Sequence, residues 1–280
     1  MRKNRKNNSH TYRKRICIMA VLLAGSLMLG GCGVKKEKEA DSELPKIVIG
    51  MDYFEPYSYQ ASDGEYKGID VELAKEAFRR LGYRPKFENI VWEDKDELLA
   101  DGTVDCLWSS YSMNGREDKY QWAGPYLYSR QMVVVKNESE IQTLSDLKGK
   151  RIAVQATTKA EDLFLHNIKS DLPQMQQVNC FSTTNEIYAA LRKSYVDAIA
   201  GHEAMLGSLV KEGKDAYRML DESIYKSELG VAFKKGTHEE VAADLTETLK
   251  KLQREGITEK IVTKYGLDAD EILPEGEQNE

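Results

Sequence analysis

Residues 46–91 decide the fold of this chain, and they read KIVIGMDYFEPYSYQASDGEYKGIDVELAKEAFRRLGYRPKFENIV. The first five residues form a short apolar run, which predicts a buried strand. Apolar residues then recur at positions 71, 74, 77, 78 and 81 with helical spacing, and Gly82 follows where a helix C-cap belongs. Residues 86–91 predict the next strand. A strand–helix–strand unit of this kind favours a parallel sheet flanked by helices.

The same alternation continues to the C-terminal part of the chain and restarts after about residue 135. Further strands are predicted at 104–108, 131–136, 151–154, 177–181, 196–200 and 229–233, with a polar turn at 109–115. Helices are predicted at 94–100, 160–169, 183–192 and 203–211, and a last one carries apolar residues from 241 to 252. Three helix starts have capping-box spacing: Asp94 with Glu97, Thr183 with Glu186, and Thr237 with Glu240. The fold class is therefore α/β with two lobes, each a mixed, mostly parallel sheet.

Composition narrows the functional classes. The chain has 280 residues, of which 41% are hydrophobic and 31% charged, and its mean hydropathy of −0.55 argues against a protein with many membrane spans. Residues 1–31 hold seven Lys and Arg and no acidic residue. The rest of the chain therefore has 33 basic and 46 acidic side chains and is strongly acidic. This acidic body argues against nucleic acid as a partner. Four His, none paired with Cys at ligand spacing, make a metal site unexpected, and we expect no cofactor.

The N-terminus has the features of an export signal. A basic segment at 2–15 precedes 14 apolar residues at 16–29, which is short for a transmembrane helix. Residues 29–32 read LGGC and resemble the lipobox of bacterial lipoproteins. The resemblance implies a signal peptide at 1–31, cleavage before Cys32, and a lipid on its sulfur. The alternatives are a buried helix or an ordinary signal with a chance Cys. Residues 32–44 are polar and charged and predict a tether.

Nine segments resemble, in order, the amino-acid-binding lipoproteins of bacterial ABC importers, the polar amino acid family of solute-binding proteins. The match covers nearly all of residues 46–266. Each segment alone is weak evidence, and the resemblance rests on the order and spacing of the segments together. The segments are 50–59 (GMDYFEPYSY), 68–73 (GIDVEL), 101–105 (DGTVD), 109–112 (SSYS), 116–117 (RE), 124–126 (GPY), 147–155 (LKGKRIAVQ), 196–198 (VDA) and 252–265 (LQREGITEKIVTKY).

The resemblance implies a Venus-flytrap fold that captures an amino acid between two lobes and delivers it to an ABC transporter permease. Lobe 1 would comprise residues 45–129 and 234–266, lobe 2 residues 135–228, and the polar tail residues 267–280. The two crossings, near 129–135 and 228–234, would form a hinge. We expect a monomer that is not an enzyme and that contacts the extracytoplasmic face of the cell membrane only through its lipid.

In lobe 1, Arg116 matches the residue that binds the ligand's α-carboxylate in the family. An Arg suits this task because its planar fork makes two parallel charge-assisted hydrogen bonds. The segment between Ser112 and Arg116 is one residue shorter than the family motif, and Arg116 could instead pair with an acidic neighbour. Further ligand-binding candidates implied for lobe 1 are Asp52, Phe54, Trp92, Ser110, Tyr111 and Ser112. Tyr57 could equally pack in the core.

In lobe 2, candidates follow two strands. Gln155, Thr157 and Thr158 come after the strand at 151–154, where the resemblance implies backbone N–H groups for a carboxylate; the threonines could instead cap the next helix. His202 stands where the family commonly has an Asp that accepts the ammonium group. Glu203 could take that role, or it could simply open the next helix, where an acid suits the helix dipole. The ligand's identity is not readable from these residues.

Three rival functions remain open at this stage. The fold is shared with cyclohexadienyl dehydratases, which would need a general acid such as Glu203 or His202 in the cleft. A regulatory domain of a peptidoglycan lytic enzyme would need a catalytic domain, and only about fourteen residues follow the last helix. An extracellular sensor or adhesin is also compatible with the sequence. Cys106 and Cys180 are expected as two buried free thiols.

Overall fold

The computed structural model describes residues 44–166, 168–169 and 171–274. The chain divides between Leu44 and Pro45, and all elements below belong to the unit that begins at Pro45. The predicted signal peptide, Cys32 and most of the tether lie outside the described residues. The strands are β1 (Lys46–Met51), β2 (Tyr59–Gln60), β3 (Tyr66–Lys67), β4 (Arg84–Asn89), β5 (Cys106–Ser112), β6 (Tyr120–Lys136), β7 (Arg151–Gln155), β8 (Gln177–Phe181), β9 (Ala198–His202), β10 (Tyr217–Met219) and β11 (Tyr225–Lys234).

Helices alternate with these strands, as the sequence predicts. None of those in the described part of the chain is long and apolar enough to cross a bilayer. The α-helices are α3 (Ile69–Arg80), α4 (Lys95–Asp101), α5 (Lys159–Phe164), α6 (Thr184–Arg192), α7 (Glu203–Glu212), α8 (Glu239–Arg254), α9 (Ile257–Lys264) and α10 (Ala269–Ile272), and two 3-10 helices are η1 (Trp92–Asp94) and η2 (Leu144–Leu147).

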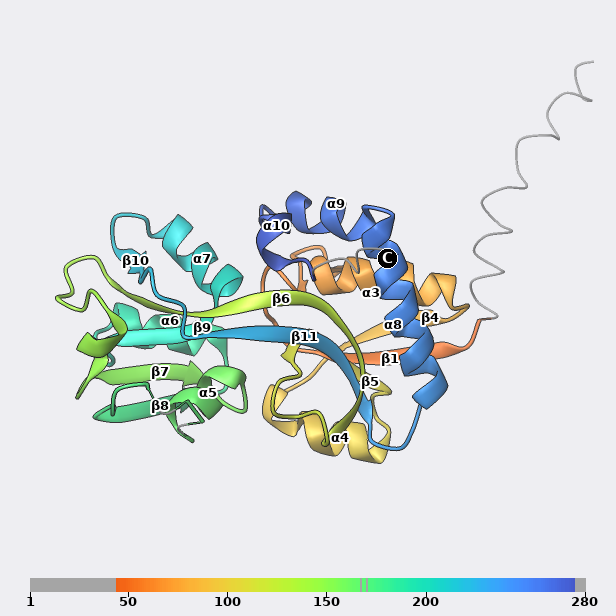
Figure 1. Cartoon of the computed structure of the whole chain (residues 1–280), viewed down its shortest axis with the longest axis horizontal. Helices are drawn as coiled ribbons and strands as arrows, with labels where there is room; N and C mark the ends of the chain where they lie inside the picture. The colour runs from red at the N-terminus through yellow and green to blue at the C-terminus, as the bar shows by residue number, and fades with distance from the viewer. Residues whose placement is uncertain (1–43, 167, 170, 275–280) are drawn as a thin grey trace, which may run out of the picture. The chain divides into compact units, whose positions relative to one another are not determined.

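One large sheet has the strand order β4-β1-β5-β11-β6-β9-β7-β8, with β10 paired to β6. β4, β1 and β5 run parallel and form what we call the first strand group; β9, β7 and β8 also run parallel and form the second strand group. The long strands β6 and β11 lie antiparallel between the groups (Figure 1). Open α/β sheets bind ligands at the carboxyl ends of their parallel strands, so we expect a ligand site at these ends.

The amphipathic helix α3 forms as its sequence predicts. Its buried face includes Leu73 and Phe78, its first turn carries acidic residues, and its last turn carries Arg79 and Arg80, which complements the helix dipole. Gly82 follows with a φ of 76°, a left-handed conformation that glycine adopts without strain. The helix covers the first strand group together with α8.

Of the three predicted capping boxes, one is present. Thr183 and Glu186 bond reciprocally at the start of α6. Asp94 makes no capping bond at α4, since it has helical dihedrals and ends η1. α8 begins after His238, which has a φ of 54°, while the Thr237 hydroxyl donates back to the Lys234 carbonyl. The last two predictions were therefore wrong, because the chain enters those helices by other turns.

The predicted polar turn at 109–115 was wrong in its first half, because β5 continues to Ser112. Its partner β11 supplies the pairing: Leu229 lies opposite Ser112, and Phe233 opposite Cys106. The register shifts between Gly230 and Ala232, so the middle of β5 bulges out of the ladder. Helix α5 is also shorter than the predicted 160–169. Both described cysteines are free, but Cys180 is exposed, so its predicted burial was wrong.

Candidate functional site

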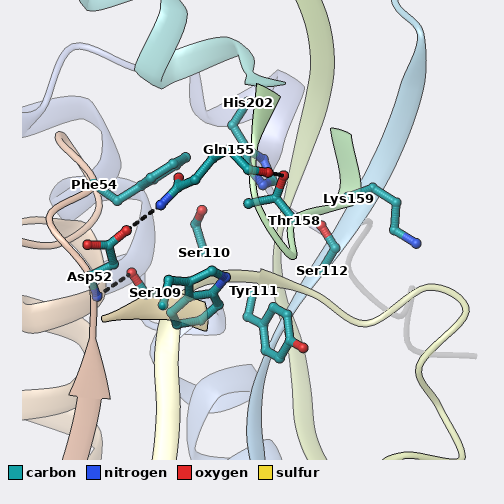
Figure 2. Close-up of a pocket in the computed structure, with 11 residues that line it drawn as sticks. Asp52, Phe54, Ser109, Ser110, Tyr111, Ser112, Gln155, Thr158, Lys159 and His202 are labelled. Carbon is teal, nitrogen blue, oxygen red and sulfur yellow. Dashed lines mark hydrogen bonds between the residues drawn. The ribbon is translucent and has the colours of Figure 1, made fainter. Parts of the chain in front are cut away.

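A cavity opens at the carboxyl ends of strands from both strand groups (Figure 2). Asp52 follows β1, Ser109 and Ser110 lie in the bulge of β5, and Ser112 ends that strand. Gln155 ends β7, and His202 ends β9. The empty space, including part of the mouth, is about 310 Å³, at the small end for small-molecule sites. The lining residues are Asp52, Phe54, Trp92, Ser109, Ser110, Tyr111, Ser112, Gln155, Thr158, Lys159 and His202.

Three polar atoms of the lining lack a hydrogen-bond partner within the described part of the chain. They are Ser110 Oγ, Ser112 Oγ and Gln155 Oε1, and all are buried. Native proteins satisfy most buried polar groups, because leaving one unpaired costs about 1–3 kcal/mol. These atoms belong to residues that line one cavity, so a polar ligand could satisfy them.

Asp52 and Gln155 bridge the cavity from opposite strand groups. Gln155 Nε2 donates to Asp52 Oδ2 over 2.5 Å and also to the Ser182 carbonyl over 3.2 Å. Burial raises the pKa of Asp52, and the hydrogen bonds from Gln155 and the Tyr53 amide only partly oppose this rise. A carboxyl group in this position can accept a hydrogen bond from a ligand or pair with its positive charge.

His202 is 6% exposed, and burial lowers its pKa to about 3, so the imidazole is neutral at physiological pH. Its Nδ1 lies 2.9 Å from the Ser129 hydroxyl on β6. The Gln131 amide lies 3.2 Å from both ring nitrogens and donates to Ser227 Oγ on β11. His202 therefore belongs to a polar cluster that joins the cavity to the two long strands.

Aromatic rings complete the walls. The Phe54 ring meets the His202 ring edge-on at 5.6 Å, and the Trp92 ring meets Tyr111 at 5.0 Å. Trp92 opens η1. Tyr57 does not line this cavity; it is 1% exposed and packs in the core, which was one of its two predicted roles.

Arg116 does not line the cavity. Its Nη2 donates to Asp162 on α5 over 2.5 Å, its Nη1 donates to the Ser112 carbonyl over 3.1 Å, and its guanidinium lies over the Tyr111 ring. The side chain is 11% exposed. The acidic partner is thus Asp162 on α5, the helix that follows β7, and not a neighbour in sequence. Arg116 sits beside the cavity wall with two of its five donors engaged.

Thr157 also lies just outside the cavity. Its backbone amide donates to the Glu161 carboxylate, and its hydroxyl accepts a hydrogen bond from Lys95 Nζ over 2.8 Å. Lys95 is 2% exposed and lies over the Trp92 ring. Burial lowers its pKa to about 8. Thr158 does line the cavity, but its hydroxyl donates to the Gln155 carbonyl. Neither threonine shows a side-chain cap bond to α5.

Glu203 turns away from the cavity. It opens helix α7, as one of its two predicted roles requires, and its carboxylate takes two hydrogen bonds from Arg130 over 2.7 and 2.5 Å. It lines a separate groove beside α9 and α10. In this structure Glu203 is therefore not brought together with the other predicted ligand-binding residues.

Two lining residues were missed from the sequence. Ser109 donates to or accepts from Ser58 Oγ over 2.7 Å and accepts from the Asp52 amide; it adjoins the predicted Ser110, and the signal was its place in the same serine cluster. Lys159 donates to the Asn114 carbonyl over 2.6 Å, and its amine points away from Asp52 (Figure 2). Its position next to the predicted Thr158 is the sequence feature that would have indicated it.

The fold and the site define a class of protein. Two groups of parallel strands, joined by two long antiparallel strands, bring their carboxyl ends to one shared polar and aromatic cavity. This is the two-domain α/β architecture of periplasmic binding proteins. A model of the bacterial extracellular solute-binding proteins, family 3, matches residues 47–268, and the chain belongs to this family.

Curated relatives match over most of their length. The L-cystine-binding protein TcyJ of Escherichia coli (strain K12) is 25% identical over 252 residues, which cover 89% of this chain and 92% of the relative. A probable histidine-binding protein of Campylobacter jejuni is 22% identical over 267 residues, covering 91% of this chain and 100% of the relative. These relatives are solute-binding proteins, and the predicted family is confirmed.

Solved structures agree with this assignment. An ABC uptake transporter substrate-binding protein from Streptococcus pneumoniae with bound histidine superimposes with a TM-score of 0.72 at 25% identity, covering 84% of this chain and 98% of the other. The substrate-binding protein of an amino acid ABC transporter gives 0.70 at 27% identity, covering 79% and 98%. The predicted fold class is confirmed.

Proposed function

We propose that this protein captures an amino acid in the cavity and delivers it to an ABC importer at the extracytoplasmic face of the membrane. One observation carries the proposal: within the residues that the structure describes, buried hydroxyl and amide atoms of Ser110, Ser112 and Gln155, from both strand groups, lack partners in one cavity. The names of the relatives support it, since TcyJ is named for cystine and the Streptococcus structure for histidine.

The ligand would complete a set of contacts that already join the two sides of the cavity, either across it or beside it. Asp52 reaches Gln155, Arg116 reaches Asp162, and Lys95 reaches Thr157. Each contact joins a residue that follows or lies beside the first strand group to the end of β7, or to the loop or helix that follows β7. A ligand that binds both sides adds to these bonds and shifts the population toward the closed state.

Residues near the cavity supply groups for a zwitterion. Arg116 would bind the α-carboxylate with its free donors, while Ser110 and Asp52 would accept from the ammonium group. His202 would contribute a neutral ring nitrogen rather than a charge. The lobes at 45–129 plus 234–266 and at 135–228 would rotate about β6 and β11, which connect the two strand groups.

A thermal-shift panel of the twenty amino acids and cystine tests the function. A ligand at 100 times its Kd is expected to add about 2.7 kcal/mol to the free energy of unfolding, which raises Tm by several degrees. Calorimetry with the best ligand should then show saturable heat without continuing reaction. Failure of every compound to shift Tm would contradict the proposal. Release of carbon dioxide from prephenate or arogenate would favour a dehydratase.

We also infer that the mature protein is a monomer held to the membrane by lipid on Cys32. The LGGC sequence at 29–32 and the polar segment after it support this inference, and a diacyl anchor supplies the two chains that stable attachment requires. Mass spectrometry of the membrane-extracted protein tests it, because the N-terminal peptide should begin at Cys32 and carry the lipid. An unlipidated N-terminus at any other residue would contradict the inference.

A further inference from the structure

A buried carboxyl group lies behind the cavity wall, outside the residues that line it. Asp70, in the first turn of α3, is 1% exposed. Its Oδ2 accepts a hydrogen bond from the Ser110 amide over 2.6 Å, and its Oδ1 accepts one from the Tyr126 hydroxyl over 2.8 Å. No Lys or Arg of the described residues forms an ion pair with it. An acid buried without a cation has a large desolvation cost, so its position calls for a reason.

The hydrogen bond from Ser110 to Asp70 gives the backbone amide of Ser110 an acceptor. Ser110 lies in the bulge of β5 and has a φ of 44°, in the left-handed region that residues other than glycine seldom adopt. Its amide donates to Asp70 instead of to a strand. Asp70 therefore satisfies a backbone donor that the bulge removes from the ladder, and the bulge brings Ser110 to the cavity.

Asp70 holds a second wall segment through its own backbone. Its amide donates to the Tyr57 carbonyl over 2.9 Å, and the preceding Ile69 amide donates to the Pro56 carbonyl over 3.0 Å. These bonds fasten the turn that carries Phe54, whose ring lines the cavity. One residue thus connects the segments that place Phe54 and Ser110.

We propose that Asp70 is a positioning residue for ligand binding, acting through Ser110 to hold the bulge of β5 in its binding geometry. This inference rests on the proposed function. Tyr57 and Tyr126 are the titratable side chains that face Asp70. Burial raises the pKa of Asp70 to about 7. The contact to the Ser110 amide needs an acceptor oxygen but no negative charge. A side-chain amide can supply such an oxygen.

Substitution of Asp70 by Ala and by Asn separates the acceptor from the charge. Affinity is measured by calorimetry on the folded fraction, with the best ligand of the amino-acid panel. Asp70→Ala is expected to weaken binding by at least about tenfold, whereas Asp70→Asn, whose side-chain oxygen can still accept from Ser110, is expected to stay within about threefold of wild type. If the Ala variant fails to fold, Asp70→Ser, which is too short to reach the amide, takes its place.

A double-mutant cycle tests the route through Ser110. Ser110→Ala removes the hydroxyl that has no partner among the described residues. It should add little to the loss already caused by Asp70→Ala, because coupled residues are not additive. Glu72→Gln in the same turn of α3, whose carboxylate faces Lys264 and Tyr265, serves as the matched control and should bind like wild type.

Two results would overturn the proposal: Asp70→Ala that binds within about threefold of wild type, or Asp70→Asn that binds as weakly as Asp70→Ala. Either leaves the proposed function intact, provided that the wild-type protein binds an amino acid. Absence of any ligand for the wild type would instead contradict the proposed function itself.

Discussion

At the scale of single residues, the guanidinium of Arg116 has two anionic partners to bind, Asp162 and the proposed ligand. The ligand's carboxylate would need its planar fork, and Asp162 already occupies one end of it. The guanidinium can serve both, because it has five N–H donors in one plane and uses Nη1 and Nη2 once each in this structure. Its place over the Tyr111 ring keeps the fork beside the cavity wall.

We predict that Arg116→Ala weakens amino-acid binding by roughly 30- to 5,000-fold. Truncating one partner of a buried charge pair costs about 2–5 kcal/mol, and each 1.4 kcal/mol corresponds to about tenfold in Kd. Arg116→Lys should also weaken binding, since an ammonium group cannot form the two-pronged contact. Titration calorimetry of both variants measures the effect.

Asp162→Asn is the matched control for this prediction. It removes the ion pair to Arg116 and leaves the guanidinium in place, so ligand affinity should stay within about threefold of wild type. Equal losses for Arg116→Ala and Asp162→Asn would show that Arg116 serves the contact between the strand groups rather than the ligand.

Sequence patterns predicted which strand ends line the cavity better than they predicted the partners of the individual side chains. Residues that end or directly follow parallel strands, such as Asp52, Gln155 and His202, line the cavity because the topology fixes where those strands end. The exceptions depend on pairing. Glu203 directly follows His202 in sequence, yet Arg130, which is 73 residues away, holds its carboxylate elsewhere. A pairing across that separation leaves no local signal.

At the scale of secondary-structure elements, helix starts show the same limit. The S/T/D-x-x-E spacing occurs at α4, α6 and α8, but the reciprocal bonds form only at α6. The difference lies in the residue before the helix. Thr183 has an extended backbone, which a capping residue needs, whereas Asp94 is helical and His238 is left-handed. Spacing alone does not report these dihedral angles.

Thr183→Ala is therefore predicted to lower the free energy of unfolding by about 1 kcal/mol, the usual value of a lost N-cap. The variant loses the acceptor for the Glu186 amide and the hydroxyl that donates to the Glu186 carboxylate, while the backbone amide at position 183 still donates to that carboxylate. Thr237→Ala, where the same spacing forms no capping box, should lower it by less. Urea unfolding of both variants provides the comparison, and equal effects would contradict the assignment.

Strand lengths were predicted less well than strand positions. β6 runs for 17 residues from Tyr120 to Lys136, although only residues 131–136 were expected. The missing part at 120–130 reads YQWAGPYLYSR and contains a Gly-Pro pair, and it is extended because β11 pairs with it. A partner more than 90 residues further along the chain decides this length, so local composition does not reveal it.

At the scale of the whole molecule, pH acts on stability through the polar cluster around His202. The folded protein resists protonation of this ring until about pH 3, while an unfolded chain takes up the proton near 6.5. Below pH 6.5 the unfolded state therefore binds more protons, and stability falls as the pH falls. Above pH 6.5 the contribution of His202 to stability is fully present.

Wild-type protein should lose about 2 kcal/mol of unfolding free energy through His202 between pH 7.5 and pH 5. His202→Gln should lack this loss, and the exposed His166→Gln should retain it. The raised pKa of Asp70 acts in the opposite direction, because the folded state gains protons first on acidification, but it acts equally in all three proteins. Denaturant unfolding at both pH values measures the difference, and parallel pH curves for wild type and His202→Gln would contradict the prediction.

The order of the large sheet places β4 and β8 at its two ends. Pro85 gives β4 a position without an amide hydrogen, and the charged Lys86 and Glu88 follow it. β8 carries Gln177 and Asn179 among its five residues. Proline, charge and short length all make an edge strand a poor template for another chain. Copies of the protein crowded together are therefore expected to resist edge-to-edge aggregation.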